Sequence, residues 1–227
     1  MNLLFERLVK PSYLYARYLA SCAADRRLGI VTADERLGHD PSNDPAPYRS
    51  VPGGYHRAVS FAAIRRALGR LAPGPSDVLL DLGCGAGRVI CVAAQHPFAR
   101  VIGVEYDRRI FALAERNAAS LRRCAVRPEV VCADAATWRV PDETTIVFMY
   151  NPFEGEVLRA AMTRLLESYD RAPRRIRLVY ANPREHDLLM SMGRFRETGR
   201  LQMSWRPGAA WARTQTIHFY ELEPDHR

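Results

Sequence analysis

Two kinds of segment alternate along most of this chain. Short and nearly continuous apolar runs are separated by longer segments whose apolar residues recur at helical spacing. Buried parallel strands have continuous apolar runs, and amphipathic helices show the 3.6-residue period. The alternation covers residues 77–82, 87–97, 100–105, 108–123, 129–133, 145–150, 154–168 and 176–181. It predicts an α/β protein whose parallel sheet is covered by helices on both faces.

The chain before this repeat has a different pattern. Residues 1 to about 30 favour a helical extension, interrupted by a proline, and residues 55–71 favour a second helix. Proline and glycine are concentrated in residues 39–54, which predicts a loop or hinge. Tyr18 and Leu19 lie among the apolar and aromatic positions of the extension. We expect these positions to pack on the main domain, although the tyrosines could instead contact a substrate.

The chain after this repeat does not continue as another strand–helix unit of a parallel sheet. Residues 184–192 favour a helix, and residues near 195–204 and 213–222 favour two strands. The last strand alternates polar and apolar positions, as expected for a closing antiparallel hairpin. The predicted division is an N-terminal helical extension and loop over residues 1–54, followed by one α/β domain over residues 55–227.

The first strand of the repeat ends in a carboxylate and a glycine-rich turn. Asp81 is followed by Gly83, Gly85 and Gly87, and an apolar helix begins near Arg88. Glycine lets a ligand approach the bare backbone, and ligands of open α/β sheets bind at the carboxyl ends of the strands. The dinucleotide fingerprint G-x-G-x-x-G would need a third glycine where Arg88 stands. Asp81 would repel a pyrophosphate but suits a ligand with a cationic amino group.

Acids also end the next two strands. Glu105 lies 18 residues beyond Gly87, close to the roughly 20 expected for an acid that binds ribose hydroxyls. Asp134 ends the third strand. Each acid could instead cap a helix N-terminus. Because all three acids stand at the carboxyl ends of predicted strands, as the glycine turn does, we favour the interpretation that they bind a nucleotide-like ligand.

The D-x-G-x-G-x-G turn resembles motif I of the class I S-adenosylmethionine (SAM)-dependent methyltransferases. The resemblance extends over about residues 55–222. Residues 25–30 and the Pro/Tyr-rich loop that follows also resemble, less specifically, bacterial members of unassigned substrate. It implies a Rossmann-like doubly wound sheet of seven strands in the order 3-2-1-4-5-7-6, with the last strand pair antiparallel. It also implies SAM as the cofactor, with the turn facing its methionine part, Glu105 on the ribose and Asp134 on the adenine edge. The cofactor contacts that it implies are Tyr55, Asp81, Gly83, Cys84, Gly85, Gly87, Glu105, Tyr106, Asp134, Ala135 and Asn151.

A polar turn, Asn151-Pro152-Phe153, follows the fourth strand. It resembles the (D/N)-P-P-(Y/F) signature of amino-methylating enzymes but has one proline fewer. The resemblance implies that Asn151 and Pro152 orient a target amine for in-line displacement, while Phe153 stacks on the target group. Such catalysis acts mainly through proximity and orientation. Alternatively, Asn151 is the N-cap and Pro152 the first residue of a helix over residues 153–168.

Cysteine and histidine positions indicate neither disulfides nor a metal site. The five cysteines are odd in number and never spaced C-x-x-C, and the six histidines show no paired spacing with cysteines or acids. No metal is therefore expected. No apolar run approaches 18 residues, and charged residues interrupt the early apolar stretch. We therefore expect a cytoplasmic protein that does not span a membrane.

The net charge of +8 bears on possible partners. Lys10 is the only lysine among 33 basic residues, so the basic character is almost entirely arginine, scattered along the chain. Scattered arginines are typical of a solvated surface, so nucleic acid is a possible partner that the charge does not specifically indicate. The methyl acceptor could be a small molecule, a protein side chain or RNA. The oligomeric state is not predicted.

Three functions remain open from the sequence. A SAM-dependent methyltransferase is favoured, with N-methylation slightly preferred. A SAM-binding regulatory module without catalysis is the alternative, because the Asn151 motif is incomplete. An NAD(P)-dependent oxidoreductase is disfavoured by Asp81 and Arg88, and by the lack of any Tyr-x-x-x-Lys pair.

Overall fold

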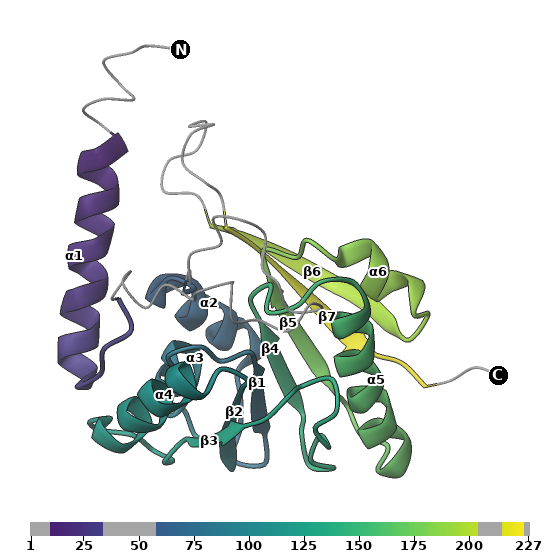
Figure 1. The fold of residues 1–227 in the computed structure, drawn as a ribbon. Coiled ribbons are helices and arrows are strands. Elements are labelled where there is room, and N and C mark those ends of the chain that lie inside the picture. The colour runs from purple at the N-terminus through teal and green to yellow at the C-terminus, as the bar shows by residue number, and fades with distance from the viewer. Residues whose placement is uncertain (1–9, 34–57, 204–214, 225–227) are drawn as a thin grey trace.

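The computed structural model describes residues 10–33, 58–203 and 215–224 of the chain (Figure 1). A seven-stranded sheet lies between two layers of helices. The strands are β1 (Val78–Leu82), β2 (Arg100–Glu105), β3 (Glu129–Cys132), β4 (Ile146–Met149), β5 (Arg177–Ala181), β6 (Phe195–Met203) and β7 (Gln215–Leu222). The helices are α1 (Lys10–Leu28), α2 (Phe61–Leu71), α3 (Arg88–Ala93), α4 (Arg108–Ser120), α5 (Gly155–Arg171) and α6 (His186–Ser191).

The strand order is β3-β2-β1-β4-β5-β7-β6. Strands β1 to β5 are parallel to one another, whereas β7 runs antiparallel to both β5 and β6. The predicted fold class and strand order are therefore confirmed.

The strand order reverses direction between β1 and β4. Leu82 at the end of β1 is in register with Val104 on one side and with Met149 on the other. The chain segments that leave β1 and β4 therefore diverge from one point on the carboxyl edge of the sheet. This is the position at which open α/β sheets bind their ligands.

Alternating residues of the strands form two apolar cores, one on each face of the sheet. Leu79 and Phe148 belong to the core shared with α2 and α3. Leu80 and Val147 belong to the other core, which includes Leu158 of α5 and other buried residues of α5 and α6. Figure 1 shows α2, α3 and α4 on one side of the sheet and α5 and α6 on the other. Burial on both faces explains the continuous apolar runs.

Side-chain caps determine where two of the helices begin. Ser60 caps α2, because its hydroxyl accepts the Ala63 N–H at 3.2 Å. Asp107 caps α4, because its carboxylate accepts the Arg109 N–H at 2.7 Å. Such caps satisfy N–H groups that have no partner inside the helix.

The N-terminal extension packs less than the sequence predicted. Tyr18 and Leu19 of α1 are 41% and 48% exposed, so the expected packing of these two residues is wrong. In Figure 1, α1 stands apart from the sheet and approaches the domain near its C-terminal end. Leu28 and Ile30, at and just beyond that end, are buried in the core. The apolar residues that attach the extension to the domain therefore lie at the C-terminal end of α1 and just beyond it. The predicted domain boundary at residue 54 lies outside the described residues and stays a prediction.

Candidate functional site

The glycine turn after β1 folds tightly onto the end of β2. Gly83, Gly85 and Gly87 all have positive φ angles, of 70°, 56° and 84°. The N–H groups of Gly83 and Cys84 both donate to the Val104 carbonyl at 2.9 Å. The Gly87 N–H donates to the Cys84 carbonyl, also at 2.9 Å. The turn therefore exposes less unpaired backbone to a ligand than the sequence predicted.

Glu105 holds the turn in place from the end of β2. Its Oε2 accepts the Gly85 N–H and its Oε1 accepts the Asp107 N–H, each at 2.9 Å. The side chain is 8% exposed. The cap of α4 is Asp107, so the alternative that Glu105 caps a helix is wrong. A carboxylate has about four acceptor sites, so Glu105 can still accept two further hydroxyl groups.

Asp81 is a second buried carboxylate beside Glu105. Among the described residues it has no hydrogen-bond or ion-pair partner, and only 3% of it is exposed. Burial, together with the negative charge of Glu105, raises the pKa of Asp81 well above its ordinary value. The cap of α3 is Gly87, so Asp81 does not cap that helix. An unpaired buried carboxylate is costly, and a cationic ligand group would offset that cost.

We expect Asp81→Asn to stabilise the ligand-free protein. A raised pKa in the folded state means that stability falls as pH rises from the unfolded value, about 3.9, through the folded value. The variant removes this loss, so its urea midpoint should exceed that of the wild type at pH 7. The difference should disappear near pH 3, where Asp81 is protonated in both states.

The matched control for this experiment is Asp187→Asn, which changes an exposed carboxylate. Its midpoint should stay close to that of the wild type at both pH values. A gain for Asp81→Asn of equal size at pH 7 and pH 3 would contradict the titration of Asp81 as its cause.

The turns that follow β1 and β4 are in direct contact. A Cβ atom built on Gly83 would overlap the Cβ of Pro152. Only glycine therefore leaves room for Pro152 at this point. The contact brings Asn151-Pro152-Phe153 against the glycine turn, as expected for a motif that meets a bound cofactor.

Asn151 does not cap a helix. Helix α5 begins at Gly155, and its N-cap position is Glu154. The alternative in which Asn151 caps a helix over residues 153–168 is therefore wrong. Asn151 has a φ of 44°, and its Oδ1 accepts the Arg184 N–H at 3.2 Å. The hydrogen bond joins the turn after β4 to the turn after β5.

Phe153 lies partly buried against the core on the α5 and α6 face. The ring therefore has apolar neighbours within the protein, and its predicted stacking on a target group stays a prediction.

The other predicted cofactor residues surround the end of β3. The Asp134 Oδ1 accepts the Ala136 N–H at 2.8 Å in a turn that directly follows the strand. Ala135 is buried, and Tyr106 is 41% exposed beside Glu105. Tyr55 lies outside the described residues.

Cys84 is a core residue in this structure. The residue is buried at the start of the turn. Burial and the neighbouring Asp81 carboxylate raise the pKa of its thiol well above the ordinary value. The thiol therefore stays protonated. The cofactor contact predicted for Cys84 would have to come from its backbone, because its side chain is buried.

Arg88 has a role that the sequence analysis missed. Its Nε donates to the Thr32 hydroxyl at 2.7 Å, and its Nη1 donates to the Val59 carbonyl at 3.1 Å. The guanidinium lies 4.7 Å from the centre of the Phe61 ring. Thr32 in turn donates from its hydroxyl to Asp25 at 2.7 Å. Arg88 therefore ties the N-terminal extension to the first helix after the glycine turn.

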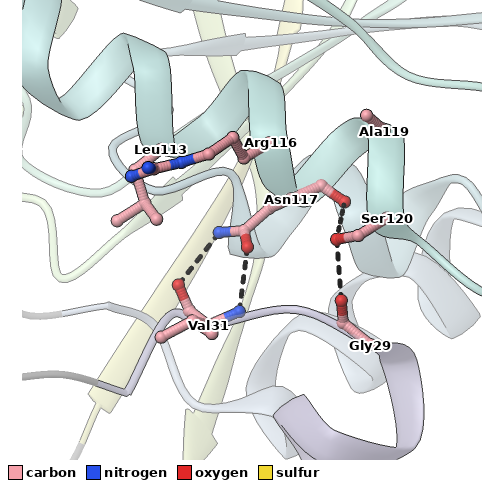
Figure 2. A pocket seen from close by; sticks show the side chains of 7 residues that line it. All are labelled: Gly29, Val31, Leu113, Arg116, Asn117, Ala119 and Ser120. Atoms are coloured by element: carbon pink, nitrogen blue, oxygen red, sulfur yellow. Dashed lines mark hydrogen bonds between the residues drawn. The ribbon is translucent and has the colours of Figure 1, made fainter.

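Asn117 of α4 forms a second tie to the extension. Its amide group accepts the Val31 N–H and donates to the Val31 carbonyl, both at 2.9 Å (Figure 2). The same Nδ2 donates to the Ala86 carbonyl in the glycine turn at 2.8 Å. The sequence signal for this role is an asparagine at helical spacing from the apolar positions of an amphipathic helix.

Comparison with known proteins assigns the domain. Residues 79–173 match the family described as "Methyltransferase domain". These residues therefore belong to a methyltransferase domain. The family match contains the glycine turn, Glu105 and the Asn151 motif, and the strand order is that of the SAM-dependent class. The predicted family is confirmed.

A curated relative of this methyltransferase domain is the 23S rRNA (uracil(1939)-C(5))-methyltransferase RlmD of Acidithiobacillus ferrooxidans. It is 34% identical over 99 residues, which are 44% of this chain and 21% of the relative. The match thus spans about a fifth of the relative's length.

Solved structures share the fold of the methyltransferase domain. An RNA methyltransferase from Salinibacter ruber, in complex with S-adenosylhomocysteine, has a TM-score of 0.56 at 21% identity, covering 75% of this chain and 97% of that chain. The glycopeptide N-methyltransferase MtfA, complexed with sinefungin, has a TM-score of 0.59 at 10% identity, covering 74% and 88%. Magnesium protoporphyrin IX methyltransferase from Synechocystis, with bound SAM, has a TM-score of 0.53 at 16% identity, covering 74% and 86%.

Among the described residues, no helix is both long enough and apolar enough to cross a membrane.

Proposed function

We propose that this chain is a SAM-dependent methyltransferase that transfers a methyl group to an acceptor nitrogen by in-line displacement. The observation that carries the proposal is the packing of Pro152 against Gly83. It places a candidate acceptor-binding turn against a candidate cofactor-binding turn, at the reversal point of the sheet.

The carboxylates at the carboxyl edge fit SAM. Asp81 is buried without a cationic partner among the described residues, and the ammonium of SAM would supply one. Glu105 keeps acceptor sites for the two ribose hydroxyls after binding the backbone of the turn. Asp134, Ala135 and Tyr106 would surround the adenine, and the contact expected from Tyr55, which lies outside the described residues, stays a prediction.

Asn151 and Pro152 would orient the acceptor. Bound SAM supplies a methyl group activated by its sulfonium centre. The Asn151 Oδ1 already accepts one N–H, from Arg184, which holds the amide in one orientation. Its second lone pair can accept a hydrogen from the acceptor amine, as can the Pro152 carbonyl. The nitrogen lone pair would then be aimed at the methyl group, and the gain would come from orientation.

The acceptor is a small molecule, a protein side chain or RNA. Two of the matched proteins are named as RNA methyltransferases, and one is a glycopeptide N-methyltransferase. The net charge of +8 is compatible with RNA and does not require it. The cytoplasm, where SAM and all three acceptor classes occur together, is the proposed compartment.

The test compares Asn151→Ala with Asn151→Asp. Calorimetry should show that both variants still bind SAM, because the other expected cofactor contacts remain, and that NAD and NADP do not bind. Transfer from methyl-tritiated SAM into RNA, protein and small-molecule fractions should fall on the order of 100-fold in Asn151→Ala. It should be retained in Asn151→Asp, because the signature accepts either residue. Gln95→Ala, an exposed amide, is the control.

Three outcomes would contradict parts of the proposal. Full transfer by Asn151→Ala would remove Asn151 from catalysis. SAM binding by the wild type without transfer to any fraction would favour the non-catalytic module. Binding of NAD in place of SAM would overturn the cofactor assignment.

A further inference from the structure

Two histidines and a glutamate meet on the α6 side of the sheet, on elements that lie beyond β5 from the strand that leads into the glycine turn. His186 is the first residue of α6, Glu197 lies in β6 and His218 in β7. One ligand atom from each lies within 4.8 Å of the other two. We call these three residues the His–Glu–His cluster. Its members come from three elements, so tertiary structure alone brings them together.

Strand pairing explains how the cluster forms. Glu197 is opposite Tyr220 in the β6–β7 ladder, and His218 lies two residues before Tyr220 on the same face of β7. The Glu197 Oε1 lies 2.9 Å from the His218 Nδ1. Helix α6 packs on this part of the sheet through the buried Leu189, which brings its first residue, His186, over β7.

Neighbouring side chains hold the cluster in position. The hydroxyl of Tyr220, a buried residue, lies 2.7 Å from the His186 Nδ1 and 3.3 Å from the His218 Nδ1. Arg200 donates to both oxygens of Glu197, at 2.5 Å and 2.7 Å. These contacts fix the orientation of both imidazole rings and of the carboxylate before an ion binds.

The donor set selects a class of metal ion. Imidazole nitrogen suits Zn²⁺ and neighbouring transition metals, whereas Mg²⁺ and Ca²⁺ prefer oxygen ligands. Two histidines and one carboxylate are a known ligand set for zinc, with a further position left for water. We propose that His186, Glu197 and His218 bind one divalent transition-metal ion of the zinc type, in a site separate from the methyl-transfer site.

Metal binding would require only small shifts of the three ligand atoms relative to one another. Tetrahedral zinc at about 2.0–2.2 Å from each ligand places ligand atoms roughly 3.4 Å apart. The His218–Glu197 separation is already shorter than this, and His186 and Glu197 are only partly buried, so their side chains can adjust. The ion would take the place of the direct contact between the His218 Nδ1 and the Glu197 Oε1.

The bound ion would link the turn after β5 to the final hairpin. His186 lies two residues after Arg184, whose N–H binds Asn151. The site would therefore restrain the same turn that contacts the candidate acceptor-binding residue. Metal binding itself needs neither SAM nor an acceptor, so the proposal stands or falls independently of the proposed function.

The experiment titrates Zn²⁺, and Co²⁺ as a spectroscopic probe, into the full-length chain without an affinity tag after chelator treatment. We expect one Zn²⁺ per chain by calorimetry, a visible Co²⁺ ligand-field band, and no binding of Mg²⁺ or Ca²⁺. His218→Ala and the isosteric Glu197→Gln should each weaken Zn²⁺ binding at least 100-fold.

The control variant is His96→Ala, which removes a histidine that precedes β2, outside the cluster. It should bind Zn²⁺ like the wild type. Circular dichroism confirms that each variant is folded, and Glu197→Gln provides the test if His218→Ala does not fold. Absence of Zn²⁺ binding by the wild type would overturn the proposal. Equal affinity in the wild type and the cluster variants would assign the ion to other residues, such as the cysteines, and would also overturn it.

Discussion

Arg88→Ala will lower the free energy of unfolding by about 3–5 kcal/mol, the range measured when one member of a buried charged network is removed. Arg88 is only 7% exposed and donates to the Thr32 hydroxyl and the Val59 carbonyl. Its loss leaves Asp25, also buried, without the nearby positive charge of the guanidinium. Urea unfolding followed by circular dichroism measures the change.

Two further variants separate the network from the charge alone. Arg88→Lys keeps the positive charge but lacks the planar fork of donors, so it should be destabilised by an intermediate amount. Arg66→Ala removes an exposed arginine of α2 and should stay within about 0.5 kcal/mol of the wild type. A loss below about 1 kcal/mol in Arg88→Ala would show that the network adds little to stability.

Glu105→Gln should have the largest effect on cofactor binding. The variant loses the charge that strengthens hydrogen bonds to the ribose hydroxyls, and its amide NH₂ group opposes the N–H of Gly85 or Asp107. A hydrogen bond to a charged group contributes about 1.5–3 kcal/mol, so SAM affinity should fall roughly 10–150-fold. Isothermal titration calorimetry measures this change directly.

Glu115→Gln is the matched control for this measurement. Glu115 is exposed on α4, and its replacement should leave SAM affinity unchanged. If Glu105→Gln bound SAM like the wild type, the ribose role of Glu105 would be wrong. The family assignment would remain, because it rests on the matched sequence and the strand order.

The sheet could be predicted because its signals are local. Strands β1, β2, β4 and β5 are short apolar runs, and burial on both faces by helices requires that pattern, whereas the edge strand β3 is partly exposed. The reversed hairpin was predictable from the alternating pattern of β7. The predicted ends of helices and strands were less accurate than the prediction that these elements exist. Helix α5 begins at Gly155, because the turn after β4 is shaped by contacts with the turns after β1 and β5.

The candidate site was predicted in part for the same reason. Asp81, Glu105 and Asp134 each follow an apolar run, and parallel strands bring their carboxyl ends to one edge. The sequence could not reveal that Glu105 binds the backbone of the glycine turn, or that Asp81 has no partner among the described residues. Both facts depend on the distance between neighbouring strand ends.

The sequence by itself determined the fold class, the strand order through its resemblance to a family, and the acids of the candidate cofactor site. Tertiary structure alone decided that Pro152 packs on Gly83, that Arg88 holds the N-terminal extension, and that His186, Glu197 and His218 form a cluster. The physical reason is how far apart the interacting residues lie along the chain. Periodicity and turn chemistry act between residues that are close in the chain, whereas these contacts join residues that only strand pairing and helix packing bring together.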